Sequence, residues 1–219
     1  MKKNYFLAIL IFCCTLLSYA QDNKTIIATY IGANLNNLEL SLTDLSDFKI
    51  LSEGTLSNKD FKTVYLQQEI NGIPVAGTSA TVLMKAGKIL KFSHVFVSSI
   101  RNQITVQTAT LSAKEAAGIA IESLGLSNKS DIKVIDSNTN NDIDQADITT
   151  SNLAAPLYYY KAENGKYVLV YEFVIKEAGS HWWITKTNAT TGNLEYKEDA
   201  MITCTFRPKI ATDNPSDHS

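Results

Sequence analysis

The stretch that decides the fold of this chain is Val-Tyr-Leu-Gln-Gln-Glu-Ile-Asn-Gly-Ile-Pro-Val, residues 64–75. Its first seven residues are rich in strand-forming side chains. Asn71 and Gly72 follow, and both residue types tolerate the positive φ angles that a two-residue hairpin turn requires. The stretch therefore predicts a β-strand and a tight turn that leads into an antiparallel partner.

The pattern continues on both sides of this stretch. Residues 80–84 are typical of a second strand, 85–88 of a turn, and 89–97 of a third strand. The third alternates, with one face formed by Ile89, Lys91 and Ser93 and the other by Leu90, Phe92 and His94. A three-stranded antiparallel meander is predicted. Upstream, residues 23–54 have a loosely helical pattern, and 41–47 indicate a short helix with polar capping side chains.

The second half of the chain repeats the order of helix and then meander. Ser112 and Glu115 form a capping box, an apolar face continues to Leu124, and Gly125 ends the predicted helix. We expect a short strand at 132–135 and a polar insert at 137–152. Four more strands separated by turns are expected at 157–160, 167–176, 182–187 and 194–196. Two such units in succession predict an α+β fold built from cystatin-like units of a helix and an antiparallel meander.

The N-terminus has the pattern of a cleavable secretory signal. Lys2 and Lys3 precede an uncharged apolar run at 6–17, and the small residues Ser18 and Ala20 predict cleavage after Ala20. The run is shorter than the roughly 20 apolar residues that span a bilayer. A lipoprotein anchor at Cys13 is the alternative, but the bulky Phe12 before it disfavours lipid attachment. We therefore expect a secreted protein with no membrane anchor after cleavage.

The composition of the mature chain bears on its possible partners and on the source of its stability. Removing residues 1–20 from 219 leaves 199 residues, with 18 basic and 22 acidic side chains and a net charge of −4. This balance gives no electrostatic reason to expect nucleic acid or an anionic membrane as a partner. Cys204 is the only remaining cysteine, so no internal disulfide is available and stability has to come from core burial.

The sequence offers too few parts for an active site. Its histidines are His94, His181 and His218, and no His-Glu-x-x-His run, nucleophile elbow, phosphate loop or dinucleotide fingerprint is present. We expect a chain that is not an enzyme and holds no cofactor. One stretch has the spacing of a calcium loop, whose oxygen ligands would be Asp136, Asn138, Asn140, Asp144 and Asp147. Its sixth position is Asn141 rather than Gly, and a solvated polar insert is the favoured interpretation.

The strand at 182–187 begins with two adjacent tryptophans. Strand alternation places one of them in the core and the other outside. We name Trp183 as the outward residue and the candidate for docking a partner, because aromatic side chains are enriched in interfaces.

Two groups of motifs resemble known proregion domains. Val64–Gln68, followed by Asn71, Gly72, Ile73, Pro74 and Val75, resembles the signature of the fungalysin/thermolysin propeptide domain. Gly87–Leu90 is similar to that family's turn into the next strand, and Leu40–Leu45, with Asp44, to its leucine-rich start. Gln68, Asn71, Gly72, Ile73 and Pro74 are the motif residues carried over. The family often has His where Thr63 stands, so no role for that His is transferred.

The second half is similar to a PepSY domain, the usual companion in such proregions. The helix at 112–124, the strand at 167–174 and the segment Asn188–Gly192 carry that resemblance, although the family more often has Asp at the position of Asn188. Residues 201–206 look like the segment that joins a proregion to its protease. The predicted organisation is a signal peptide at 1–20, a propeptide-like domain at 21–106, a PepSY-like domain at 107–200 and an exit segment at 201–219.

The resemblance implies that the chain is the proregion of a secreted zinc metalloprotease, acting as its inhibitor and folding assistant. Its partner would be the catalytic domain, in cis or in trans, and zinc is expected only in that domain. Within the exit segment, Ile202, Cys204 and Phe206 are further docking candidates. The alternative is a free-standing secreted binding or surface protein that reuses the same domains, for example for carbohydrate.

Overall fold

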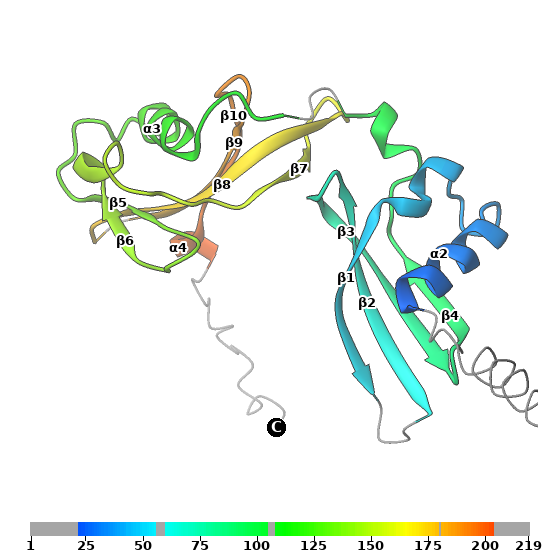
Figure 1. Cartoon of the computed structure of the whole chain (residues 1–219). Helices are drawn as coiled ribbons and strands as arrows, with labels where there is room; N and C mark the ends of the chain where they lie inside the picture. Colours follow the sequence, from blue (N-terminus) through cyan, green and yellow to red (C-terminus); the bar gives the residue numbers. More distant parts are fainter. Residues whose placement is uncertain (1–21, 56–59, 105–107, 180, 204–219) are drawn as a thin grey trace, which may run out of the picture. The chain divides into compact units, whose positions relative to one another are not determined.

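The computed structural model describes residues 22–55, 60–104, 108–179 and 181–203. These residues form a mixed α+β structure with ten strands, which pair mostly antiparallel; β3 and β7 meet in a parallel bridge between Val75 and Tyr159 (Figure 1). Its residues group into two compact units. The first contains residues up to 72 and 77–102, and the second contains 73–76 and the residues from 103 onward. The boundary predicted from the sequence lies between residues 106 and 107.

The first unit is a four-stranded antiparallel sheet with a helix packed on one face. Strands β1 (Phe48–Thr55), β2 (Phe61–Ile70), β3 (Ile73–Lys85) and β4 (Lys88–His94) pair in chain order. Helix α2 (Asn23–Ala33) and the 3-10 turns η1 (Leu42–Ser46) and η2 (Ile100–Asn102) complete it. The helix contributes Ile27 and Ile31 to a core shared with alternate residues of the strands, namely Phe48, Val64, Leu66, Ala80, Val82 and Met84.

The predicted meander is present, and one strand of this first unit was not predicted. Residues 48–55, included in the loosely helical stretch 23–54, form β1 along the edge of β2. Only Phe48 of this strand is buried, and its register shifts between Ile50 and Ser52. An edge strand that buries a single side chain leaves no period-2 pattern to detect. Pairing with β2 stabilises it instead.

The predicted faces of the third strand also need correction. The register of β3 with β4 shifts between Leu83 and Met84, so that Leu83 pairs with Lys91 and Met84 with Ile89. A bulge of this kind inserts one residue and reverses the phase of the strand beyond it. Ile89 therefore packs on the same core as Phe92, and Leu90 is exposed.

The second unit is a sheet centred on the long strand β8 (Tyr167–Glu177). One edge of β8 pairs with β7 (Leu157–Lys161) and β5 (Ile132–Ile135), and the other with β9 (His181–Asn188). Strands β6 (Asp142–Asp144) and β10 (Leu194–Asp199) continue the sheet beyond β5 and β9. The 3-10 turn η3 (Gln145–Asp147) follows β6, and the short helix α4 (Ala200–Thr203) follows β10.

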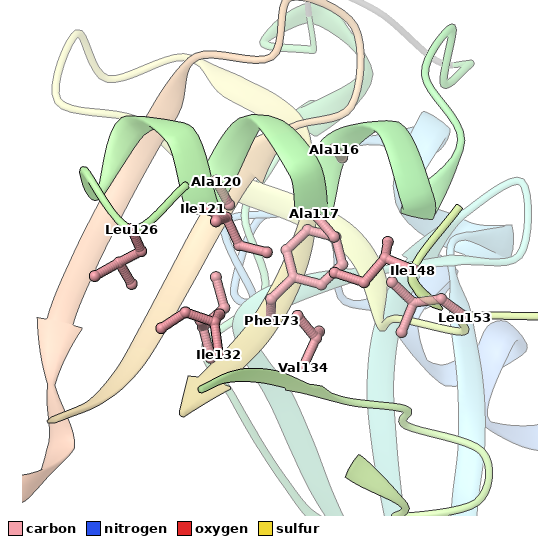
Figure 2. Close-up of a cluster of buried hydrophobic side chains, with 11 residues drawn as sticks. Ala116, Ala117, Ala120, Ile121, Leu126, Ile132, Val134, Ile148, Leu153 and Phe173 are labelled. Carbon is pink, nitrogen blue, oxygen red and sulfur yellow. The ribbon is translucent and has the colours of Figure 1, made fainter. Parts of the chain in front are cut away.

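Helix α3 (Ala113–Ser123) covers one face of this second sheet. The predicted capping box is confirmed: Ser112 N donates to Glu115 Oε2 at 2.7 Å and Glu115 N donates to Ser112 Oγ at 3.3 Å. Gly125, at φ +71°, ends the helix as predicted. Alanines face the sheet, which lets the helix approach Phe173 closely (Figure 2). Residues 137–152 were predicted to be a polar insert, but Ile148 within this insert is buried in the core.

Candidate functional site

The hairpin turn between β2 and β3 has the predicted backbone. Asn71 and Gly72 have φ angles of +53° and +82°, which is the left-handed pair that a two-residue turn of this type requires. Ile73 is half-buried at the start of β3 and Pro74 beside it is exposed. Proline lacks an N–H group, so it is tolerated near the beginning of a strand. The turn places the two ends of the motif side by side.

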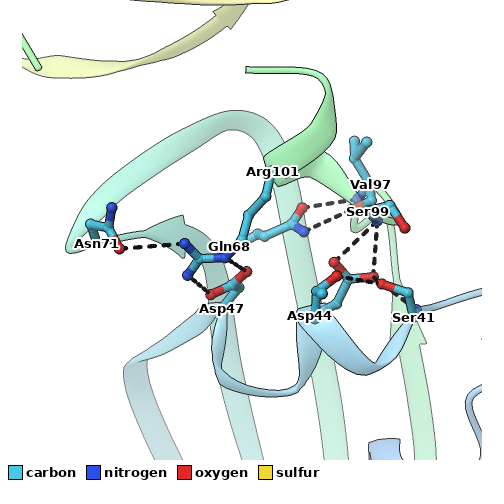
Figure 3. A network of polar contacts seen from close by, with 9 residues as sticks. Ser41, Asp44, Asp47, Gln68, Asn71, Val97, Ser99 and Arg101 are labelled. Carbon is cyan, nitrogen blue, oxygen red and sulfur yellow. Dashed lines mark hydrogen bonds and ion pairs between the residues drawn. The ribbon is translucent and has the colours of Figure 1, made fainter. Parts of the chain in front are cut away.

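Gln68 is the buried centre of the motif. Its side chain is fully buried, and its amide binds the backbone of Val97 twice (Figure 3). Gln68 Nε2 donates to Val97 O at 2.8 Å, and Val97 N donates to Gln68 Oε1 at 2.9 Å. A primary amide has one donor and one acceptor on the same edge, so it can replace a backbone strand partner. Gln68 thereby holds the chain that leaves β4 against β2.

Two aspartates of the first unit hold the same segment. Asp44 is buried, and its carboxylate accepts hydrogen bonds from Ser41 N at 2.9 Å and from Ser99 N at 3.0 Å. Asp47, also buried, accepts from Arg101 in a bidentate pair: Nε donates at 2.8 Å and Nη2 at 2.5 Å. Parallel N–H bonds from one guanidinium give both strength and orientation. Asp44 was expected to cap the short helix at 41–47 and carries part of the family resemblance, whereas the pair of Asp47 with Arg101 was not predicted.

The hydrogen bonds of this network hold parts of the first unit together. The side chains of Asp44, Asp47, Gln68 and Asn71 in Figure 3 are all bonded within the first unit; for Asn71, Oδ1 accepts from Arg101 Nη1 at 3.5 Å. Arg101 therefore connects the hairpin turn to the η1 region through Asp47. The motif residues position a hairpin and the segment 97–101, and they present no set of groups suited to proton transfer or nucleophilic attack.

The calcium-loop candidates of the second unit have other partners. Asp136 is buried, and four donors surround its carboxylate: Asn138 N, Thr139 N and Thr139 Oγ1 bind Oδ1, and Ala154 N binds Oδ2 at 2.7 Å. The bond from Ala154 N is the main cause that lowers the pKa of Asp136 below its ordinary value, with Thr139 next.

The remaining candidate ligands lie apart from that carboxylate or face solvent. Asn138, Asn140, Asp144 and Asp147 are exposed. Asp144 forms an ion pair with Lys133 at 3.7 Å. Within the part of the chain that the structure describes, no group of three or more His, Cys, Asp or Glu side chains is arranged to hold a metal ion. Asp136 therefore anchors its loop through hydrogen bonds.

The tryptophan pair alternates as predicted, but in the opposite phase. Trp182 is the exposed residue, with 46 % of its surface accessible, whereas Trp183 packs against the α3 core. The register explains this: Trp183 pairs with Ile175, a core residue of β8, and Trp182 pairs with Lys176. Lys176 Nζ lies 4.9 Å from the Trp182 ring centroid. The outward aromatic residue is Trp182 rather than Trp183.

Beside Trp182, the face of the second sheet opposite α3 carries a cluster of tyrosines and charges. Lys186 Nζ lies 4.0 Å above the Tyr196 ring and 5.3 Å above the Tyr160 ring, and 3.5 Å from Glu172 Oε2. The Tyr158 hydroxyl donates to Glu172. Burial, together with this carboxylate, raises the pKa of Tyr158, so its hydroxyl stays protonated. These contacts fix the side chains of an aromatic cluster on this face of the sheet.

The exit segment begins as a helical turn. Helix α4 spans Ala200–Thr203, and Asp199 Oδ1 accepts from Met201 N at 3.0 Å. A carboxylate that accepts from the residue two positions later turns the chain, which explains why the strand ends there. The side chain of Ile202 and the residues Cys204 and Phe206 lie outside the described residues, so their docking role stays a prediction.

The predicted signal peptide, residues 1–20, also lies outside the described residues. Across residues 22–203, apart from the short gaps, no helix has the length and apolar character needed to cross a bilayer.

Comparison with known proteins gives a match to a family model and a likeness to solved structures. A search of curated proteins finds no match. Among solved structures, the Bacillus megaterium YpeB C-terminal domain is similar at 14 % identity, over 78 % of this chain and 63 % of that chain, with a TM-score of 0.32. The chain thus spans less than two thirds of that domain's length. The family model described as the Fungalysin/Thermolysin Propeptide Motif matches residues 46–95, which contain the hairpin and Gln68.

Proposed function

We propose that this chain is the proregion of a fungalysin/thermolysin-type zinc metalloprotease and acts as its inhibitor and folding assistant. The observation that carries the proposal is the family match at 46–95, which begins at the end of η1, contains β1 to β4 in full and ends just beyond β4. This stretch forms the whole sheet of the first unit, with its turn and its buried Gln68 in place. A propeptide motif fits a chain that is not catalytic by itself.

The partner under this proposal is the protease catalytic domain, joined to this chain or separate from it. The sequence contains no His-Glu-x-x-His run, so the zinc of such a protease would be held by that domain. A folded proregion can inhibit by occupying the substrate cleft and can assist folding by stabilising the native protease through binding. The exit segment after β10 would lead toward the cleft, and extended residues beyond Thr203 would pair with the substrate-binding edge.

Inhibition in trans tests the proposal. We would measure casein hydrolysis by a mature fungalysin-type protease with the full chain, and with a chain that ends after Thr203. The shorter chain keeps every described residue and removes Cys204 and Phe206. We expect the full chain to inhibit, and the shorter chain to inhibit at least about tenfold less, a loss of about 1.4 kcal/mol in binding. Equal inhibition would assign the binding to the folded units.

Recovery of activity by denatured protease, with and without the chain, tests the folding role. If the chain neither inhibits nor increases recovery, the proregion proposal fails.

A second candidate is a secreted binding protein that uses the open face of the second sheet. It is favoured by the exposure of Trp182 and by the rigid arrangement of Lys186 between Tyr160 and Tyr196. Aromatic residues held in one conformation lose little entropy on binding, so they suit protein or carbohydrate recognition. Binding of polysaccharides by the wild-type chain but not by a Trp182→Ala variant, without any effect on proteases, would favour this candidate.

A further inference from the structure

The end of β10 carries an ion pair that the proposed function does not use. Asp199 is the last residue of β10, and only 5 % of its side chain is accessible. Its Oδ2 contacts Nδ1 of His181, the first residue of β9. Its Oδ1 accepts from Met201 N at 3.0 Å and from Trp182 N at 3.4 Å. One carboxylate therefore joins the start of β9, the end of β10 and the first turn of the exit segment.

His181 is placed where its charge can change. Its side chain is 40 % accessible, so protons exchange freely with solvent. Its ring lies 5.2 Å from the Trp183 ring, which holds it beside Asp199. Histidine ordinarily gains and loses its charge between about pH 5 and pH 8. A protonated ring forms an ion pair with Asp199, whereas a neutral ring contributes only a single uncharged donor.

The charged groups on the neighbouring elements are already paired. Glu177 lies opposite His181 in the register of β8 with β9 and forms an ion pair with Lys129. Lys176 pairs with Asp142 at 2.7 Å. On β10, the Glu198 carboxylate accepts from the Tyr196 hydroxyl at 2.5 Å. Asp199 is therefore the carboxylate that responds most directly to the charge of His181.

Asp199 stays ionised across the relevant range. Burial by itself raises the pKa of Asp199, but the hydrogen bonds from His181 and from the backbone N–H groups of Met201 and Trp182 outweigh burial and lower the pKa below its ordinary value. The Asp199 carboxylate is therefore ionised at mildly acidic, neutral and alkaline pH.

We propose that His181 and Asp199 form a pH-sensitive clamp on the exit turn, which holds residues 200–203 against the second unit at acidic pH and loosens at alkaline pH. The clamp depends on the two oxygens of the Asp199 carboxylate, because one contacts His181 and the other accepts from Met201 N. When His181 is protonated, its charge fixes Asp199 in the position from which Oδ1 accepts the Met201 N–H. When His181 is neutral, Asp199 is held less firmly, and the turn opens more often. The clamp itself does not depend on the proposed function, whereas a role of the clamp in regulating a proregion would rest on that function.

Hydrogen exchange of the Met201 amide tests the clamp on the purified full chain. We would measure its protection factor by NMR at pH 5.5 and pH 8, corrected for the intrinsic pH dependence of exchange. We expect protection to fall about threefold or more as the pH rises, because histidine loses its charge in this range. In a His181→Gln variant, whose side chain still donates but carries no charge, protection is expected to be the same at both pH values.

Two further variants complete the test. Asp199→Asn removes the ion pair, so protection should be low at both pH values. The matched control is His94→Gln in the first unit, where His94 Nδ1 accepts from the backbone N–H of Phe96. This variant is expected to keep the wild-type pH dependence. For each variant, tryptophan fluorescence checks that the second unit is folded.

Two results would overturn the clamp: no pH dependence in the wild type, or an undiminished dependence in His181→Gln. Because the measurement involves no protease, either result leaves the proposed inhibition standing, and a failure of inhibition leaves the clamp standing.

Discussion

Replacement of Gln68 by Met tests the centre of the matched motif. Methionine has a similar length and flexibility, so the substitution fills the same space and removes both hydrogen bonds to Val97. The N–H and C=O groups of Val97 then lose their partners. An unpaired buried polar group costs about 1–3 kcal/mol. With part of the cost relieved by water at the edge of the unit, we expect Gln68→Met to lower the free energy of unfolding by about 3 kcal/mol.

The neighbouring Gln67 supplies a matched control. It is half-buried on the other face of β2, where its Nε2 donates to Thr78 Oγ1 at 2.9 Å and to Gln68 O at 3.1 Å. Water can replace these bonds at a half-exposed site. Gln67→Met is therefore expected to cost about 1 kcal/mol or less.

Urea unfolding measured by two spectroscopic signals distinguishes the stability of the first unit from that of the second. Both tryptophans, Trp182 and Trp183, lie in the second unit, so fluorescence reports that unit, whereas circular dichroism reports both. We expect Gln68→Met to shift the dichroism transition and to change the fluorescence transition little. A loss of 3 kcal/mol corresponds to a fall of roughly 12–24 °C in Tm for a domain of this size. Costs below 0.5 kcal/mol for Gln68→Met, or equal costs for the two glutamines, would refute the structural role of Gln68.

Three other predictions follow from single positions. A Cβ at Gly72 meets no atom within 4 Å, so Gly72→Ala should cost only its positive φ, about 1 kcal/mol, whereas Gly192→Ala also places Cβ 2.8 Å from Ile119 Cδ1 and should cost more in urea unfolding. The fully buried hydroxyl of Thr185 has no hydrogen-bond partner among the described residues, so Thr185→Val should raise stability by up to about 1 kcal/mol, measured by tryptophan fluorescence. The depressed pKa of Asp136 means that its stabilisation is present above about pH 4 and is lost as the pH falls through its folded pKa; Asp136→Asn should flatten this acid limb of stability against pH.

The features that could be predicted from the sequence are those set by neighbours along the chain. The turn at Asn71 and Gly72 and the capping box of Ser112 with Glu115 depend on backbone preferences over four residues or fewer, and the structure confirms them. The pair of Asp47 with Arg101 joins residues far apart along the chain, and no local pattern marks it.

The phase of a strand is also not a local property when a bulge or a neighbouring strand sets it. The alternation of the tryptophans was predicted correctly, but which of them faces outward depends on the register of β9 with β8, where Trp182 lies opposite Lys176. A shift of one residue exchanges the two faces. The bulge in β4 had the same effect on Ile89 and Leu90.

The burial of the motif has a consequence for partner recognition. Gln68 and Asp47, which hold the matched hairpin together, are buried and bonded within the first unit, so they cannot also contact another protein without unfolding it. A partner meets only exposed groups, and interface energy comes mainly from aromatic and arginine side chains that can be desolvated on binding. The exposed aromatic residues Tyr65, on β2 of the first unit, and Trp182, on the open face of the second, meet that requirement. The motif therefore specifies the scaffold, and the choice of protease under the proposed function has to be sought in residues that the motif does not fix.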